Sequence, residues 1–257
     1  MSRLRAWLDA SPIADLAITF MREATGRPDP IEPLRPTRPA ALAPGRRVAF
    51  WSLVGGVGGS TTAGLVAHRS AAGGRAPLLV DLDRWAPSLA LRARIEAATI
   101  ADALVQPGRE RALVSRWSGV QFLPGSPALR GRLDVDRTIE VIEAIGGDAP
   151  VVLDLGAGAD GLDGGLLSRT DRLCMVAGAR ASQLQAVFCA LALVRDVPCP
   201  TGLVVVGAAD DDAVLIAERV GLPLLGAIPA DPYLAEDQFA TRAPTLRAID
   251  ALIRRIG

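Results

Sequence analysis

Short apolar stretches alternate with helix-like stretches from residue 46 to residue 257. The predicted strands cover residues 48–53, 77–82, 120–123, 150–155, 172–177, 202–206 and 223–228. The predicted helices cover residues 61–72, 88–97, 100–105, 136–145, 182–194, 212–220 and 245–256. Apolar strands that alternate with helices indicate a mostly parallel sheet covered on both faces. We therefore expect an α/β domain with a doubly wound sheet, in which ligands bind beyond the carboxyl ends of the strands.

The first 45 residues follow a different pattern. Residues 3–25 carry apolar side chains at helical spacing, which predicts one bent amphipathic helix or two short ones. Residues 27–45 are rich in proline, which favours an extended linker. The sequence thus predicts a helical segment at 1–26, a linker at 27–45 and a main domain at 46–257. The helix either folds back over an apolar patch of that domain or docks on a protein partner or a membrane surface.

Charge balance and rare residue types exclude several classes of function. The 28 basic residues are matched by 28 acidic ones, so there is no global electrostatic case for nucleic-acid binding. The single histidine argues against histidine triads and multi-histidine metal sites. Three cysteines without CxxC spacing fit reduced, buried thiols in the cytoplasm. No apolar run approaches the roughly 20 residues that cross a bilayer, and Asp9 and Asp15 interrupt any signal-peptide core.

A glycine-rich loop follows the first strand of the main domain. Residues 53–62 read Leu-Val-Gly-Gly-Val-Gly-Gly-Ser-Thr-Thr, the layout of a strand, a phosphate-binding loop and a helix start. Glycines let the backbone approach an anion, and loop N–H groups with the helix N-terminus can cradle phosphate. Ser60 is placed to bind Mg²⁺ through its hydroxyl. The alternative is a glycine turn that only packs a helix tightly on a strand.

Acidic residues close two of the predicted strands. Asp81 and Asp83 end the strand at 77–82, and two such carboxylates repel each other unless a cation or hydrogen-bond donors compensate. Asp154 ends the strand at 150–155 and is followed by glycines. This arrangement suits a Mg²⁺-facing aspartate and a mobile loop whose N–H meets a terminal phosphate. An aspartate after a strand is otherwise often a helix cap.

Together these motifs resemble the MinD/ParA family of dimeric P-loop ATPases, whose loop reads KGGVGKTT, and the resemblance spans residues 46–257. Asp83 stands where that family has its water-positioning aspartate, which makes it the candidate catalytic residue. Residues 154–158 resemble the DxxAG switch, residues 225–231 the GxIPxD segment that lines the base, and residues 122–125 an LPAG-type turn. The resemblance implies that ATP is bound by Gly55, Gly56, Val57, Gly58, Gly59, Ser60, Thr61, Gly158, Pro229 and Asp231. It implies that Mg²⁺ is bound by Ser60, Asp81 and Asp154.

The chain departs from that family in its positive charges. Val54 and Gly59 stand at the two signature lysines, and all 28 basic residues of the chain are arginine. The adenine-reading asparagine is missing at residues 207–208. A degenerate Walker A loop without the phosphate lysine is similar to that of CpaE/TadZ proteins, which help to assemble Tad-type pili. Arg84 and Arg180 lie near predicted strand ends and are either compensating cations or solvated surface arginines.

These observations leave three hypotheses. The first is a cytoplasmic, homodimeric, ATP-dependent positioning or assembly factor that hydrolyses ATP weakly. The second is a pseudo-ATPase scaffold that binds no nucleotide and docks a protein partner through its N-terminal helix. The third, a conventional DNA-partitioning ATPase, is disfavoured because the lysines and any basic stretch are missing. The apolar stripe of residues 246–256 either packs on the sheet or contacts the inner face of a membrane.

Overall fold

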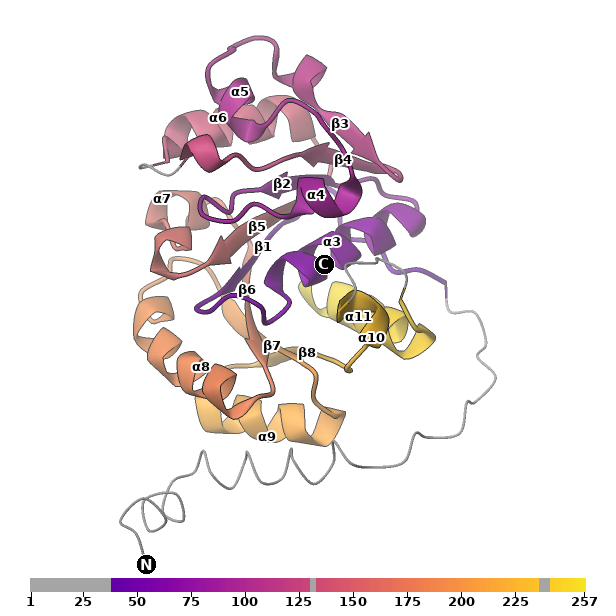
Figure 1. Cartoon of the computed structure of the whole chain (residues 1–257), viewed down its shortest axis with the longest axis vertical. Coiled ribbons are helices and arrows are strands. Elements are labelled where there is room, and N and C mark those ends of the chain that lie inside the picture. Colours follow the sequence, from indigo (N-terminus) through magenta and orange to yellow (C-terminus); the bar gives the residue numbers. More distant parts are fainter. Residues whose placement is uncertain (1–37, 130–132, 236–240) are drawn as a thin grey trace, which may run out of the picture.

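The structure is a computed structural model that describes residues 38–129, 133–235 and 241–257. The predicted N-terminal helix and most of the predicted linker lie outside the described residues. The labels of helices and strands follow Figure 1.

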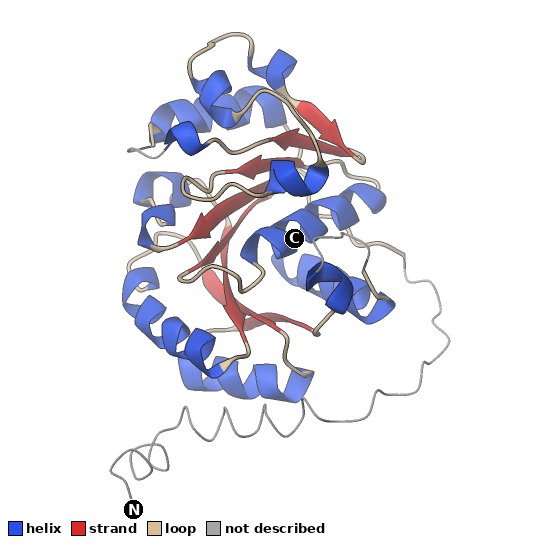
Figure 2. Ribbon diagram, viewed as in Figure 1, coloured by secondary structure: helices blue, strands red, loops and turns tan. Residues whose placement is uncertain are grey.

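Within the described residues the strands form one eight-stranded sheet in the order β3-β4-β2-β5-β1-β6-β7-β8. All neighbouring strands that are described pair in parallel except β3 and β4, which are antiparallel (Figure 2). The strands are β1 (Arg47–Ser52), β2 (Leu78–Asp81), β3 (Ser115–Trp117), β4 (Val120–Leu123), β5 (Val151–Ala157), β6 (Arg172–Gly178), β7 (Thr201–Val206) and β8 (Leu224–Ile228). The predicted α/β, mostly parallel sheet is therefore confirmed.

Helices cover both faces of this sheet (Figure 1). One face is covered by α3 (Gly59–Ala72), α4 (Leu89–Ala93) and α11 (Ala243–Ile256), with the short α10 (Pro232–Ala235) nearby. The other face is covered by α5 (Ile100–Leu104), α6 (Val135–Gly146), α7 (Gly164–Leu167), α8 (Ala181–Val194) and α9 (Asp210–Val220). Three short 3₁₀ turns are described, η1 (Glu110–Leu113), η2 (Pro127–Leu129) and η3 (Ala159–Gly161).

The alternation of side chains along β1 explains how one sheet supports two cores. Val48 and Phe50 join the cluster under α3 and α11, whereas Ala49 and Trp51 join the cluster under α6 and α8. All four side chains are fully buried. Because successive strand residues point to opposite faces, a strand buried on both sides must be apolar throughout. The continuous apolar runs in the sequence are the consequence.

Two parts of the chain differ from the pattern-based expectation. Strand β3 was not predicted, because it is three residues long, lies at the sheet edge and carries Arg116 in its middle. The helix expected over 88–97 ends at Ala93, because Arg94 takes a left-handed conformation with φ 54°. Regular helical hydrogen bonding cannot continue through such a residue.

Residues 38–45, which the pattern assigns to the linker, pack on the main domain. Leu42 is fully buried in the cluster formed with α3 and α11. The backbone N–H of Ala40 donates to Asp250 at 2.9 Å, and that of Leu42 donates to Ser70 at 3.1 Å. This end of the predicted linker therefore belongs to the folded body.

The apolar stripe of α11 also has a structural role. Ile249, Leu252, Ile253 and Ile256 are fully buried against the sheet and α3. These four side chains therefore pack on the sheet, as the first of the two alternatives expects. In the part of the chain that the structure describes, no helix is both long and apolar enough to span a bilayer.

The cysteines differ from the expectation in one case. Cys174 and Cys199 are buried, but Cys189 is exposed on α8. All three are free thiols. Burial raises the pKa of Cys174 to about 12, so this thiol is unreactive at neutral pH.

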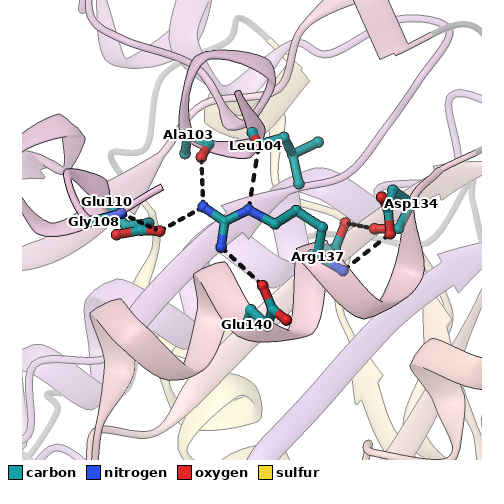
Figure 3. A network of polar contacts seen from close by, with 8 residues as sticks. Ala103, Leu104, Gly108, Glu110, Asp134, Arg137 and Glu140 are labelled. Atoms are coloured by element: carbon teal, nitrogen blue, oxygen red, sulfur yellow. Dashed lines mark hydrogen bonds and ion pairs between the residues drawn. The ribbon is translucent and has the colours of Figure 1, made fainter. Parts of the chain in front are cut away.

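A polar network holds α5, η1 and α6 together at the β3 side of the molecule (Figure 3). At its centre Arg137 contacts Glu110 at 2.5 Å and Glu140 at 3.0 Å. The same guanidinium donates to the carbonyls of Ala103 and Leu104, which end α5. One side chain thereby satisfies the last carbonyls of one helix and ties it to two other elements.

Candidate functional site

The glycine-rich loop connects β1 to α3 at the carboxyl end of the sheet. Gly56 and Gly58 adopt left-handed conformations with φ 77° and 98°, which side chains other than glycine rarely tolerate. Gly58 is the residue before α3, and its carbonyl accepts hydrogen bonds from the N–H and hydroxyl of Thr62, both at 2.8 Å. Gly55 and Gly56 are exposed, so the loop is open to solvent. The local geometry is that of an anion-binding turn at a helix N-terminus.

Two carboxylates lie side by side next to this loop. Strands β2 and β5 are neighbours, and their register pairs Asp81 directly with Asp154. Both side chains are fully buried. Asp81 accepts hydrogen bonds from the N–H groups of Asp83 at 3.1 Å and Leu89 at 3.4 Å. As the sequence predicts, the two strands bring an acid each to the carboxyl-end side of the sheet, and the two acids lie on neighbouring strands.

The protonation of this pair is shifted by its surroundings. Burial raises the pKa of Asp81 well above its usual range, and the charge of Asp154 raises it further. Burial likewise raises the pKa of Asp154 to about 6. The Ser60 hydroxyl and the Gly156 N–H favour the charged form of Asp154 and oppose that shift, and the Arg92 charge does so as well. Burial thus favours the protonated form of both acids.

These residues fit a magnesium ion. The Oδ2 atom of Asp154 is buried and has no hydrogen-bond partner among the described residues. Ser60 lies at the start of α3 and influences the Asp154 carboxylate. No group of three or more His, Cys, Asp or Glu side chains suited to a metal ion occurs among the described residues. Such a sparse set is typical of Mg²⁺, which binds one or two protein oxygens and takes its other ligands from phosphates and water.

Asp83 follows β2 and is held firmly. Its Oδ1 accepts hydrogen bonds from the N–H groups of Trp85 at 2.9 Å and Ala86 at 3.0 Å. The turn at Gly156 packs against it so closely that a β-carbon there would lie 2.3 Å from the Asp83 Cγ. The charge of Asp83 contributes to the raised pKa of Asp154. The candidate catalytic carboxylate is therefore fixed beside the candidate metal ligands.

The loop after β5 is tied to its neighbours. The Gly158 N–H, predicted to meet a terminal phosphate, donates instead to the Ser52 carbonyl at 2.9 Å. The Gly158 carbonyl accepts from the Trp51 indole at 2.8 Å. Arg84 donates to the Asp160 carbonyl, and the Trp85 indole donates to the Asp160 carboxylate at 3.2 Å. The expected mobile loop is thus clamped from β1 and from the segment after β2.

The segment after β8 is placed differently from the acids. Asp231 accepts hydrogen bonds from the Tyr233 and Arg242 N–H groups and from the Thr245 hydroxyl, at 3.1, 2.8 and 2.8 Å. Its side chain therefore organises the starts of α10 and α11. Pro229 is half-buried and lines an open groove of about 550 Å³ between α9 and α11. A nucleotide-binding role for these two residues stays a prediction.

The arginine that reaches the loop is one that the sequence analysis missed. Arg84 contacts Asp160, and Arg180 is exposed at the start of α8. Arg92 of α4 instead donates a hydrogen bond from Nη1 to the Thr61 hydroxyl, directly after Ser60. The sequence alone does not identify Arg92 as the arginine that reaches the loop, because Arg84 and Arg94 nearby in the chain carry the same charge.

No protein-family model matches the sequence, and no curated protein matches it. Solved structures of similar fold do match. A ParA family ATPase from Chlorobium tepidum TLS is 19% identical with a TM-score of 0.67, covering 81% of this chain and 99% of that one. The septum site-determining protein MinD complexed with Mg-ADP, from Pyrococcus horikoshii OT3, is 20% identical with a TM-score of 0.64, covering 81% and 94%. A chain of the MinC:MinD cell division protein complex of Aquifex aeolicus is 18% identical with a TM-score of 0.66, covering 81% of this chain and 95% of that one. The sheet order, the glycine loop and these similarities together give the chain the P-loop fold of the MinD and ParA ATPases.

Proposed function

We propose that this protein is a Mg·ATP-binding positioning or assembly factor that hydrolyses ATP weakly. One observation carries the proposal. The open glycine loop, Ser60 and the buried pair Asp81 and Asp154 lie together at the carboxyl ends of the central strands. An unpartnered carboxylate oxygen in that pair calls for a cation. A structural platform without a ligand gains nothing from such a pair, because two buried acids destabilise the fold.

The roles of the residues follow from their positions. The loop N–H groups at 55–61 and the N-terminus of α3 would hold the phosphates. Ser60, Asp81 and Asp154 would hold Mg²⁺ where β2 and β5 end. The ion supplies charge neutralisation between the phosphate oxygens when it is bound. Asp83, fixed by two backbone N–H groups, would orient a water molecule near the terminal phosphate.

Slow turnover follows from the missing cations. Val54 and Gly59 occupy the positions of both signature lysines, and the chain holds no lysine elsewhere or in the loop. A cation placed on the transferring phosphoryl group is worth on the order of 10³–10⁵ in rate in phosphoryl-transfer enzymes. Binding through backbone amides and Mg²⁺ survives this loss better than bond cleavage does, because cleavage depends on charge that develops only in the transition state.

The wider assignments rest on the similar proteins. Proteins of this fold include a MinD solved together with its partner MinC. We infer a cytoplasmic protein that forms a nucleotide-dependent homodimer and recruits a protein partner, with the N-terminal segment as the docking element. Assembly of a pilus or secretion system is the specific process that the CpaE/TadZ-like loop favours. We assign contact with the inner face of a membrane to the N-terminal segment, since Ile249, Leu252, Ile253 and Ile256 of α11 are buried.

A titration of a fluorescent ATP analogue, with Mg²⁺ and with EDTA, tests the proposal. We expect Mg²⁺-dependent binding in the wild type, a dimer in light scattering, and phosphate release slower than about 1 s⁻¹. Asp154→Asn should lose the Mg²⁺ dependence, whereas the exposed Asp160→Asn should keep it. Turnover well above 1 s⁻¹ would contradict weak hydrolysis, and failure of the wild type to bind ATP would contradict the whole proposal.

The scaffold alternative keeps one observation in its favour. The loop at 158–160, which is expected to contact the terminal phosphate, is already hydrogen-bonded to Ser52, Trp51 and Arg84. In that alternative the wild type binds no nucleotide, and its oligomeric state is the same with and without Mg·ATP.

A further inference from the structure

Arg92 reaches the phosphate-binding loop from outside it. It lies on α4, a five-residue helix that packs on the same face of the sheet as α3. Its guanidinium donates from Nη1 to the Thr61 hydroxyl in the first turn of α3. The side chain is half-buried, which keeps its charge in a less polar setting than bulk water.

The helix that carries Arg92 is attached to Asp81. The N–H of Leu89, the first residue of α4, donates to the Asp81 carboxylate at 3.4 Å. Leu89 is fully buried, so it anchors the helix to the core. Helix α4 ends at Arg94, whose left-handed conformation turns the chain away. The short helix is thus attached at one end to the candidate metal site and presents Arg92 to the loop.

The charge of Arg92 acts on the site. It is one of the groups that stabilise the charged form of Asp154, so the guanidinium and that carboxylate are electrostatically close. Arg92 therefore contacts the first turn of α3 two residues after Gly59, which stands in place of a lysine, and its charge reaches Asp154. Since a guanidinium carries five N–H donors in a planar fork that matches phosphate oxygens, a bond to Thr61 is compatible with a phosphate contact.

We propose that Arg92 is a phosphate-binding residue that replaces the missing loop lysine by reaching in from α4. The inference rests on the proposed function, because it concerns the same nucleotide site. The ligand class is a nucleoside di- or triphosphate whose phosphates lie over residues 58–61. The arginine neutralises ground-state charge from the side of the loop, so it supports binding rather than rapid cleavage.

The test uses Arg92→Gln in the full chain. Glutamine keeps a hydrogen-bond donor near Thr61 but removes the charge, which limits damage to folding. We expect Arg92→Gln to weaken Mg·ATP binding about 10- to 100-fold, the range for losing a hydrogen bond to a charged group. Affinity for AMP should change far less than affinity for ATP. Arg94→Gln removes the same charge two residues away on an exposed side chain and should leave ATP affinity within about twofold.

A second variant separates ligand binding from a structural role. Gly59→Lys restores the family's lysine, and a β-carbon at Gly59 meets only the Ser52 hydroxyl, at 3.6 Å, an ordinary contact. The double variant Arg92→Gln/Gly59→Lys should bind ATP at least tenfold more tightly than Arg92→Gln alone. If Arg92→Gln weakened binding only by disturbing the packing of α4, the lysine would not restore the affinity. If the wild type binds ATP and Arg92→Gln binds it equally well, or if Gly59→Lys gives no rescue, the role of Arg92 is overturned and the proposed function stands. If the wild type binds no ATP, both fall.

Discussion

Asp81 and Asp154 occupy matching positions on β2 and β5, so two fully buried carboxylates stand one strand apart. Both oxygens of Asp81 accept hydrogen bonds from backbone N–H groups, and Oδ1 of Asp154 accepts one from Gly156. The Asp154 Oδ2 has no hydrogen-bond partner among the described residues. A pair of this kind makes the stability of the protein depend on pH and on bound cations.

We predict that Asp154 makes the protein without ligand more stable as the pH falls from about 7 towards 5. Burial raises the pKa of Asp154 from 3.8 to about 6, so the folded state binds a proton more tightly than the unfolded state does. The stability from this group is fully present below 3.8 and is lost as the pH rises through about 6. Thermal unfolding across that range at constant ionic strength measures the effect.

Asp154→Asn should flatten this profile and raise the unfolding free energy above pH 7 by about 2–3 kcal/mol. Saturating Mg·ATP should flatten the wild-type profile too, because a bound cation favours the ionised acids. A pH profile that Asp154→Asn leaves unchanged would contradict this account.

Gly156→Ala should destabilise the protein by about 2–4 kcal/mol, because it combines overpacking with a left-handed backbone. Gly156 has φ 68°, and a β-carbon there would lie 2.3 Å from the Asp83 Cγ. Gly55→Ala is the matched control, since a β-carbon at Gly55 meets nothing within 4 Å. Urea unfolding of the two variants gives the comparison, and equal losses would show that the contact with Asp83 carries no weight.

Glu110→Gln should lower the melting temperature at pH 7 more than Glu140→Gln does. The hydrogen bond from Arg137 lowers the pKa of Glu110 to about 2. The Glu110 side chain is 9% exposed, whereas that of Glu140 is 65% exposed, so only the first contact is sheltered from solvent.

The sign of the Glu110 effect is opposite to that of Asp154. Its stabilisation is present above about 4.5 and is lost as the pH falls towards 2. The melting temperatures of the two variants, measured by circular dichroism, should therefore converge as the pH falls from 4.5 towards 2. A difference that persists there would mean that the ion pair is not its source.

Leu42→Ala should cost about 2–5 kcal/mol, the range for emptying a fully buried leucine site. Leu91→Ala, at a side chain that is 79% exposed, should cost well under 1 kcal/mol. Chemical unfolding of both variants checks the expectation. Equal, small losses would show that residues 38–45 lie loosely on the domain.

Periodicity located most of the sheet because its strands are buried on both faces, as the apolar run from Val48 to Trp51 illustrates. The rule that ligands bind at the carboxyl ends of parallel strands is enough to predict Asp81 and Asp154 on the same side of the sheet. The contact of Arg92 with Thr61 could not be predicted in this way, because it depends on where a five-residue helix stops.

Capping and burial account for the other differences. Asp231 resembles a ligand residue in sequence, yet its carboxylate is used by three donors around α10 and α11. Leu42 lies among prolines that suggest an extended linker, but extended chain can still bury a leucine against helices. Local composition reports backbone conformation, whereas these roles depend on partners that are distant along the chain.

The bond between Gly158 and Ser52 changes what recognition of a third phosphate would involve. A γ-phosphate oxygen can bind the Gly158 N–H only by displacing the Ser52 carbonyl, which already accepts that hydrogen bond. Such an exchange trades one hydrogen bond for another and yields little net free energy. The protein should consequently bind di- and triphosphate nucleotides with similar affinity. A partner protein that separates Gly158 from Ser52 would free this N–H and increase the preference for the triphosphate.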